Sequence, residues 1–78
     1  MLEAFGGRQR DLLTLLLNHK KGLTIDQMAA SLNITRNSVR EHVRVLERAR
    51  LLAPAAFTVT GGRPGRVYAL TDRGLALF

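Results

Sequence analysis

The sequence contains no cysteine. This absence excludes disulfide bonds, thiolate metal sites and iron–sulfur ligation within its 78 residues. The two histidines, His19 and His42, lie far apart in the sequence and do not form a metal-binding cluster by themselves. We therefore expect neither a metal nor another cofactor, and a cysteine-free chain fits the reducing cytoplasm.

Long apolar runs are also missing. The longest, Leu15 to Leu17 and the Pro54-interrupted Leu51 to Phe57, fall far short of the ~20 residues that a membrane-spanning helix requires. The N-terminus carries Glu3 and lacks the basic-then-apolar order of a signal peptide. We expect no membrane association.

Acidic residues are few, and the basic excess is concentrated in one part of the chain. The formal net charge is +6, with 12 Lys and Arg against 6 Asp and Glu. Residues 36–66 contain seven Arg and two Glu, whereas residues 1–35 carry a net +1 and residues 67–78 no net charge. An Arg-dominated block indicates a polyanionic partner, although charge alone fits an ordinary solvated surface equally well.

The length fits one small domain spanning residues 1–78. A chain this short buries only about 60% of the surface of its unfolded form and cannot support two cores. The hydrophobic share of 46% and the charged share of 23% are typical of a globular protein. The chain leaves no room for a catalytic cleft with a lid, and its Ser and Thr residues lack an arranged base, so we expect no enzymatic activity.

Two helices are predicted in the first half of the chain. Leucines between Arg8 and Lys21 cover an arc of about 200°, wide enough for a helix with two packing partners, and Gly22 would cap its end. The excess width also favours a dimer interface on this helix. Thr24 and Gln27 have capping-box spacing and begin a short second helix that ends near Leu32.

A third helix follows across a turn of about three residues, the arrangement of a helix-turn-helix. Asn33 favours the left-handed conformation that a sharp turn requires, and Thr35 can cap the new helix. Its buried stripe is Val39, Val43 and Leu46. Polar residues occupy the opposite face and its N-terminal flank: Arg36, Asn37, Ser38, Arg40, Glu41, Arg44 and Arg48.

These side chains are the types that read bases in the major groove of DNA. Arg can fork onto guanine, Asn onto adenine, and Glu can accept from cytosine. A lone helix of this kind is more often an ordinary solvated amphipathic helix, but the preceding short helix and turn favour DNA recognition. We expect base contacts from Arg36, Asn37, Ser38, Arg40 and Glu41, and contacts to phosphates or outer bases from Arg44 and Arg48. Thr35, at the start of the helix, is also expected to belong to the DNA-binding surface.

The last third of the chain predicts a β-hairpin. Residues 57–60 and 66–70 alternate as strands around a Gly-rich turn at 61–65. Gly62 and Gly65 allow a close approach of the backbone, and Arg63 and Arg66 place charge where it could meet phosphates or the minor groove. Thr71 can cap a last helical turn that runs to Phe78. The predicted class is α+β, mainly α.

Two stretches carry a resemblance to a known superfamily. Residues 32–52 are similar to the helix-turn-helix of ArsR-type and MarR-type winged-helix repressors, and residues 61–74 resemble the wing of SufR-like regulators. The resemblance implies a winged helix-turn-helix with a three-helix core, a hairpin wing and a C-terminal helical turn. It further implies a bacterial or archaeal regulator that binds operator DNA as a homodimer. Arg50 stands where the family usually has Gly, which predicts a strained or longer helix exit.

The partner expected first is double-stranded DNA. We expect a homodimer through the Leu-rich first helix and the apolar segment Leu75 to Phe78, and an effector domain or ligand outside this chain. SufR-like members carry cluster-ligating cysteines in a C-terminal sensor region, which this sequence lacks. The alternative is a winged-helix module that binds protein through the same apolar surfaces. The Arg block argues against that alternative.

Overall fold

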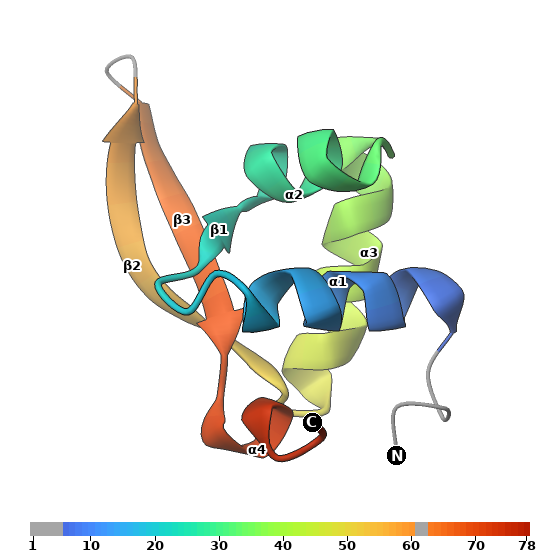
Figure 1. The fold of residues 1–78 in the computed structure, drawn as a ribbon. Helices are drawn as coiled ribbons and strands as arrows, with labels where there is room; N and C mark the ends of the chain where they lie inside the picture. The colour runs from blue at the N-terminus through green and yellow to red at the C-terminus, as the bar shows by residue number, and fades with distance from the viewer. Residues whose placement is uncertain (1–5, 61–62) are drawn as a thin grey trace.

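The computed structural model describes residues 6–60 and 63–78, and it confirms the predicted winged helix-turn-helix, of α+β class and mainly α (Figure 1). The elements in chain order are α1 (Gly7–Leu17), β1 (Leu23–Thr24), α2 (Ile25–Leu32), α3 (Arg36–Arg48), β2 (Leu52–Thr60), β3 (Arg63–Leu70) and α4 (Asp72–Leu75). The β2–β3 hairpin extends beside the helices, and α4 lies near the C-terminal end of α3. None of the described helices is long and apolar enough to cross a membrane.

The core is formed where α1 packs against α2, α3 and β3. Its largest fully buried side chains come from all three main helices: Leu12, Leu13, Leu16, Met28, Val39, Val43 and Leu46. Leu15 and Leu17 are half-buried. The wide leucine arc of α1 therefore finds its packing partners within this chain.

Helix α1 ends earlier than predicted, at Leu17 instead of Lys21. The side-chain amide of Asn18 donates to the carbonyl of Thr14 at 3.1 Å, and Nδ1 of His19 lies 2.9 Å from the carbonyl of Leu15. The backbone N–H of His19 donates to Leu16 instead of Leu15, so the His19 side chain covers a carbonyl that a continuing helix would have used. The prediction that the helix runs on through its basic residues was wrong.

Gly22 does not cap α1 but allows β3 to approach. Its φ of 95° is positive, and a Cβ at this position would lie 2.5 Å from Cγ1 of Val67 and 2.6 Å from the carbonyl oxygen of Tyr68. Any side chain here would collide with β3. The close approach lets β1 pair with β3, with Leu23 opposite Tyr68.

The predicted threonine caps are confirmed. Thr24 forms a complete capping box with Gln27, in which the Gln27 N–H donates to Thr24 Oγ1 and the Thr24 N–H donates to Gln27 Oε1. Thr35 Oγ1 accepts the Ser38 N–H at 3.1 Å, and Thr71 caps α4 in the same way.

The sheet is antiparallel with the order β1-β3-β2. The hairpin is longer than predicted, because pairing continues from Leu52 opposite Leu70 to Thr60 opposite Arg63. Residues 63–65 therefore lie in strand β3 and not in the turn. Pro54 sits in the edge strand β2 next to a register shift, a position that tolerates a residue without an N–H.

Candidate nucleic-acid interface

The turn between α2 and α3 sets the direction of α3. Asn33 has the predicted left-handed conformation, with φ 56° and ψ 46°. The Ile34 N–H donates to the carbonyl of Ala29 at 3.1 Å, which closes the end of α2. Thr35 then starts α3 with its side chain as the cap. The buried stripe of α3 faces the core, so the opposite side of this helix faces solvent.

That outward side carries most of the residues expected to contact DNA. Six of them are exposed: Arg36, Asn37, Arg40, Glu41, Arg44 and Arg48. Ser38 is half-buried and is therefore less accessible than the prediction requires. The hydroxyl of Thr35 accepts the Ser38 N–H and thereby caps α3. Periodicity therefore predicted the exposed face correctly but not the recessed position of Ser38.

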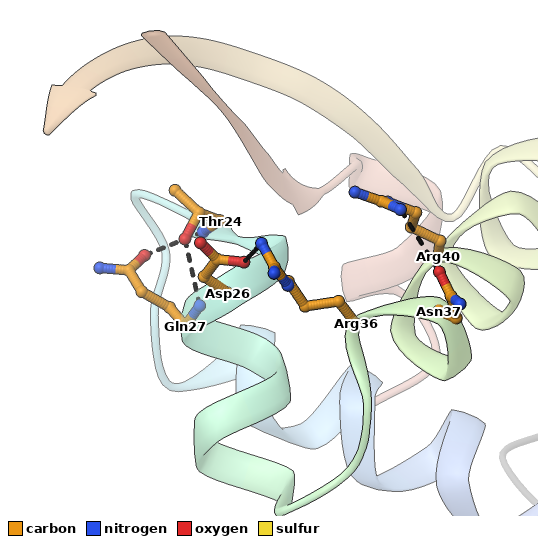
Figure 2. A network of polar contacts seen from close by, with 6 residues as sticks. All are labelled: Thr24, Asp26, Gln27, Arg36, Asn37 and Arg40. Carbon is orange, nitrogen blue, oxygen red and sulfur yellow. Dashed lines mark hydrogen bonds and ion pairs between the residues drawn. The ribbon is translucent and has the colours of Figure 1, made fainter. Parts of the chain in front are cut away.

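Two polar contacts hold side chains at the start of α3 (Figure 2). Nη1 of Arg36 lies 3.3 Å from Oδ1 of Asp26 on α2, and Nη1 of Arg40 donates to Oδ1 of Asn37 at 3.4 Å. Asp26 was not among the residues predicted to contact DNA. Its pairing with Arg36 depends on how the turn folds α3 back against α2, which no local pattern encodes.

A hollow of about 270 Å³ lies between α3 and the sheet. Its lining brings together α2, α3 and β3: Ile25, Arg40, Val43, Arg44, Glu47, Arg66 and Tyr68. Three arginines against one glutamate make this groove basic. It joins predicted residues of the helix and of the wing, which were assigned from separate parts of the sequence.

Four lining residues of the groove were not predicted as site residues. Ile25 belongs to the apolar pattern of α2, Val43 to the buried stripe of α3 and Tyr68 to the strand pattern of β3, and Glu47 lies at the margin of that stripe. Nothing local in the sequence marks them as site residues. Their convergence follows from the packing of β3 beside α3.

The other predicted wing residues lie along β3 or beyond the described part of the chain. Arg63 pairs with Thr60, and Gly65 pairs with Thr58. Gly62 lies outside the described residues. Arg66 is exposed and lines the basic groove.

The C-terminal end of α3 closes with a left-handed residue. The Leu51 N–H donates to the carbonyl of Leu46 and the Arg50 N–H to that of Glu47, both at 2.9 Å, which is the Schellman pattern. Arg50 has φ 62°. The predicted strained exit is confirmed, and α3 is not extended by it, because α3 ends at Arg48.

Residue Thr71 links this helix end to the end of the wing. Its hydroxyl donates to the carbonyl of Arg50 at 2.6 Å, and its N–H donates to the carbonyl of Leu51 at 3.0 Å. Because Thr71 directly follows β3, the exit of α3 and the base of the wing are held together.

No group of three or more potential metal-ligating side chains occurs in the described part of the chain. The chemistry of the surface is instead that of exposed guanidinium, amide and carboxylate groups along α3 and β3.

The fold and this basic surface define a winged helix-turn-helix domain of the transcription-regulator type. The family model described as "Helix-turn-helix domain" matches residues 9–55, and the chain belongs to this family. No curated protein matches the sequence.

Solved structures of regulators share the fold. MepR, a transcription regulator of the Staphylococcus aureus multidrug efflux pump MepA, is 30% identical with a TM-score of 0.75, over 94% of this chain and 52% of MepR. A mutant of S. aureus MepR bound to oligodeoxyribonucleotide is 28% identical with a TM-score of 0.75, over 95% of this chain and 53% of the mutant.

A MarR-family transcriptional regulator from Rhodococcus sp. RHA1 has a TM-score of 0.77 at 22% identity, over 95% of this chain and 50% of that protein. This likeness shows the fold alone. The present chain thus spans about half the length of these regulators. The resemblance to a winged-helix regulator is confirmed, whereas the ArsR-type and SufR-like details stay predictions.

Proposed function

We propose that the chain binds double-stranded DNA sequence-specifically, as the DNA-reading domain of a bacterial or archaeal transcription regulator. The observation that carries this proposal is the basic groove, where Arg40 and Arg44 of α3 meet Arg66 of β3. A helix that enters the major groove and a wing that follows the backbone need cationic side chains on these two elements at once. The protein would act in the cytoplasm, with its target DNA.

Each predicted residue has a role in this proposal. Arg36, Asn37, Arg40 and Glu41 would contact base edges, because they are exposed on the first two turns of α3. Ser38 would reach bases only from its recessed position, and Thr35 would act mainly by capping. Arg44 and Arg48 would contact phosphates or outer bases, and Gly62, Arg63, Gly65 and Arg66 would form the wing contacts.

The MepR mutant bound to oligodeoxyribonucleotide supports the proposal that this chain binds DNA, since its fold aligns with nearly the whole of the present chain. A two-fold homodimer would place two copies of α3 in successive major grooves about 34 Å apart. Leu12, Leu13 and Leu16 are buried within the chain and offer nothing to such an interface. Leu75 and Phe78 remain 39% and 46% exposed, so the apolar C-terminal segment is the better candidate.

Selection of bound duplexes from a random pool, followed by titration at several salt concentrations, tests the proposal. The logarithm of affinity should fall linearly with the logarithm of salt concentration, by about 0.9 for each phosphate contact. If Arg40 makes a bidentate contact with a guanine, Arg40→Ala should weaken the free energy of binding to the selected duplex by about 1–3 kcal/mol. Arg66→Ala should weaken binding to all duplexes alike.

Arg73→Ala is the matched control, because Arg73 is also exposed but lies on α4. It removes the same charge away from the groove and should change affinity least. Affinity that does not depend on salt, or equal losses in all three variants, would contradict DNA binding through this surface. A protein partner bound independently of salt would favour the interaction-module alternative.

A further inference from the structure

Asp26 places a carboxylate beside the first residue of α3. Its Oδ1 lies 3.3 Å from Nη1 of Arg36, and the two side chains are 71% and 65% exposed. Figure 2 shows the pair spanning the space between α2 and the start of α3. An acidic group therefore stands next to the arginine that begins the surface proposed to read DNA.

The carboxylate is carried by a well-defined helix start. Asp26 lies in the first turn of α2, between the two partners of the capping box, Thr24 and Gln27. Both hydrogen bonds of that box are present, at 2.9 and 3.1 Å. The backbone that carries Asp26 is thus fixed, and the pair constrains the more flexible side chain of Arg36.

The geometry leaves Arg36 able to donate elsewhere. The contact uses one Nη1 N–H, and within the described residues Arg36 has no other hydrogen-bond partner. A guanidinium has five N–H donors in a planar fork. Arg36 can keep its contact to Asp26 while its remaining donors face a base. A phosphate, by contrast, is attracted by the net charge near Arg36. The carboxylate of Asp26 lowers that net charge and itself repels phosphates.

We propose that Asp26 is a specificity-determining residue, which positions Arg36 for base readout and suppresses its sequence-independent attraction to phosphate. This inference rests on the proposed DNA-binding function. It assigns an acidic residue outside α3 to the discrimination between DNA sequences.

A simpler role for Asp26 is the stabilisation of α2, because an acidic group in the first helical turn interacts favourably with the helix dipole. That role would change the melting temperature of the protein. It would not change the ratio of affinities for two DNA sequences, and it would not depend on Arg36.

The experiment compares Asp26→Asn with the wild-type chain on the selected duplex and on a scrambled duplex of equal length and composition. Affinity for the scrambled duplex should rise by about two- to fivefold, the range that an exposed ion pair supplies. Affinity for the selected duplex should rise less. The ratio of the affinity for the selected duplex to that for the scrambled duplex should therefore fall. The salt slope on the scrambled duplex should steepen by about 0.9, equivalent to one more phosphate contact.

Asp11→Asn is the matched control, since Asp11 pairs with Arg8 on α1 and its loss changes the charge equally. It should leave the affinity ratio unchanged. Asp26→Glu should restore discrimination. In an Arg36→Gln background, Asp26→Asn should no longer change the ratio, because Asp26 acts through Arg36.

An unchanged ratio in Asp26→Asn, or a change that persists in the Arg36→Gln background, would overturn the inference while leaving DNA binding intact. If the wild-type chain itself neither binds DNA nor discriminates between duplexes, the proposed function fails and this inference fails with it. Melting temperatures of all variants separate the helix-dipole effect from the effect on discrimination.

Discussion

The two ends of α3 are held in different ways. At its N-terminal end, Thr35 caps the helix, and the exposed side chain of Arg36 pairs with Asp26. At its C-terminal end, backbone hydrogen bonds close the helix, and Thr71 ties the carbonyl of Arg50 to the base of the wing.

The N-terminal end of α3 carries side chains proposed to contact bases, whereas the C-terminal end fixes the helix to the wing. Side-chain contacts at an exposed helix start can exchange with a ligand at little cost, because exposed ion pairs contribute only about 0–1 kcal/mol. Backbone contacts at the other end cannot exchange without moving the wing. In the proposed DNA surface, side chains at the start of α3 can therefore change partners, whereas the backbone at the end of α3 is held in place.

The largest effect is expected from Gly74→Ala at the anchored end. Gly74 is buried, and a Cβ there would collide with the carbonyl oxygen of Leu51 and press on Leu70. Because the backbone must move, we expect the free energy of unfolding to fall by about 3 kcal/mol, the upper end of the range for overpacking. Chemical denaturation measures this loss. An unchanged free energy of unfolding would show that α4 does not anchor the helix exit.

A direct comparison of the two ends uses the two capping threonines. Each accepts a backbone N–H at 3.1 Å, but only the Thr71 hydroxyl also donates, to Arg50. Thr35→Ala should cost about 1 kcal/mol, as for a lost cap. Thr71→Ala should cost about 2 kcal/mol, since it loses a further hydrogen bond. Thermal unfolding of both variants, with Thr→Ser as control at each site, measures the difference. Equal losses would remove the proposed distinction.

The smallest effect, and a gain, is expected from Arg50→Gly. A left-handed conformation costs an L-residue about 1–2 kcal/mol, while glycine costs about 0.5–1 kcal/mol through its greater freedom in the unfolded chain. The free energy of unfolding should therefore increase by about 0.5–1 kcal/mol, which corresponds to a rise of a few degrees in melting temperature. Arg48→Gly removes the same side chain within α3 and should destabilise by about 1 kcal/mol. Loss of stability in both variants would contradict the strain at Arg50.

Helix starts and the exposed face of α3 could be predicted from the sequence because their causes are local. A threonine three residues before an available N–H, or an apolar stripe at helical spacing, is visible in a short window. Asn33 was also predicted, since the left-handed residue after a helix is commonly Gly or Asn. Arg50 was singled out only through the resemblance to a family that usually has Gly there.

Features that depend on distant parts of the chain could not be predicted. Gly22 looked like a helix cap, but its conformation serves the approach of β3. The hairpin turn looked longer than it is, because the pairing of Arg63 with Thr60 overrides the turn preference of Gly and Pro. The pairing of Asp26 with Arg36 and the basic groove likewise require the assembled fold.

The pairing of Leu23 with Tyr68 has a consequence for the order of folding. The contacts between α2 and α3 are local and can form early, whereas β1 must wait for a strand from the far end of the chain, whose closure costs more entropy. During synthesis, the helix-turn-helix would emerge before the strand that completes its sheet. Residues 9–55, which the family model matches, include β1 but not β3, the strand with which β1 pairs.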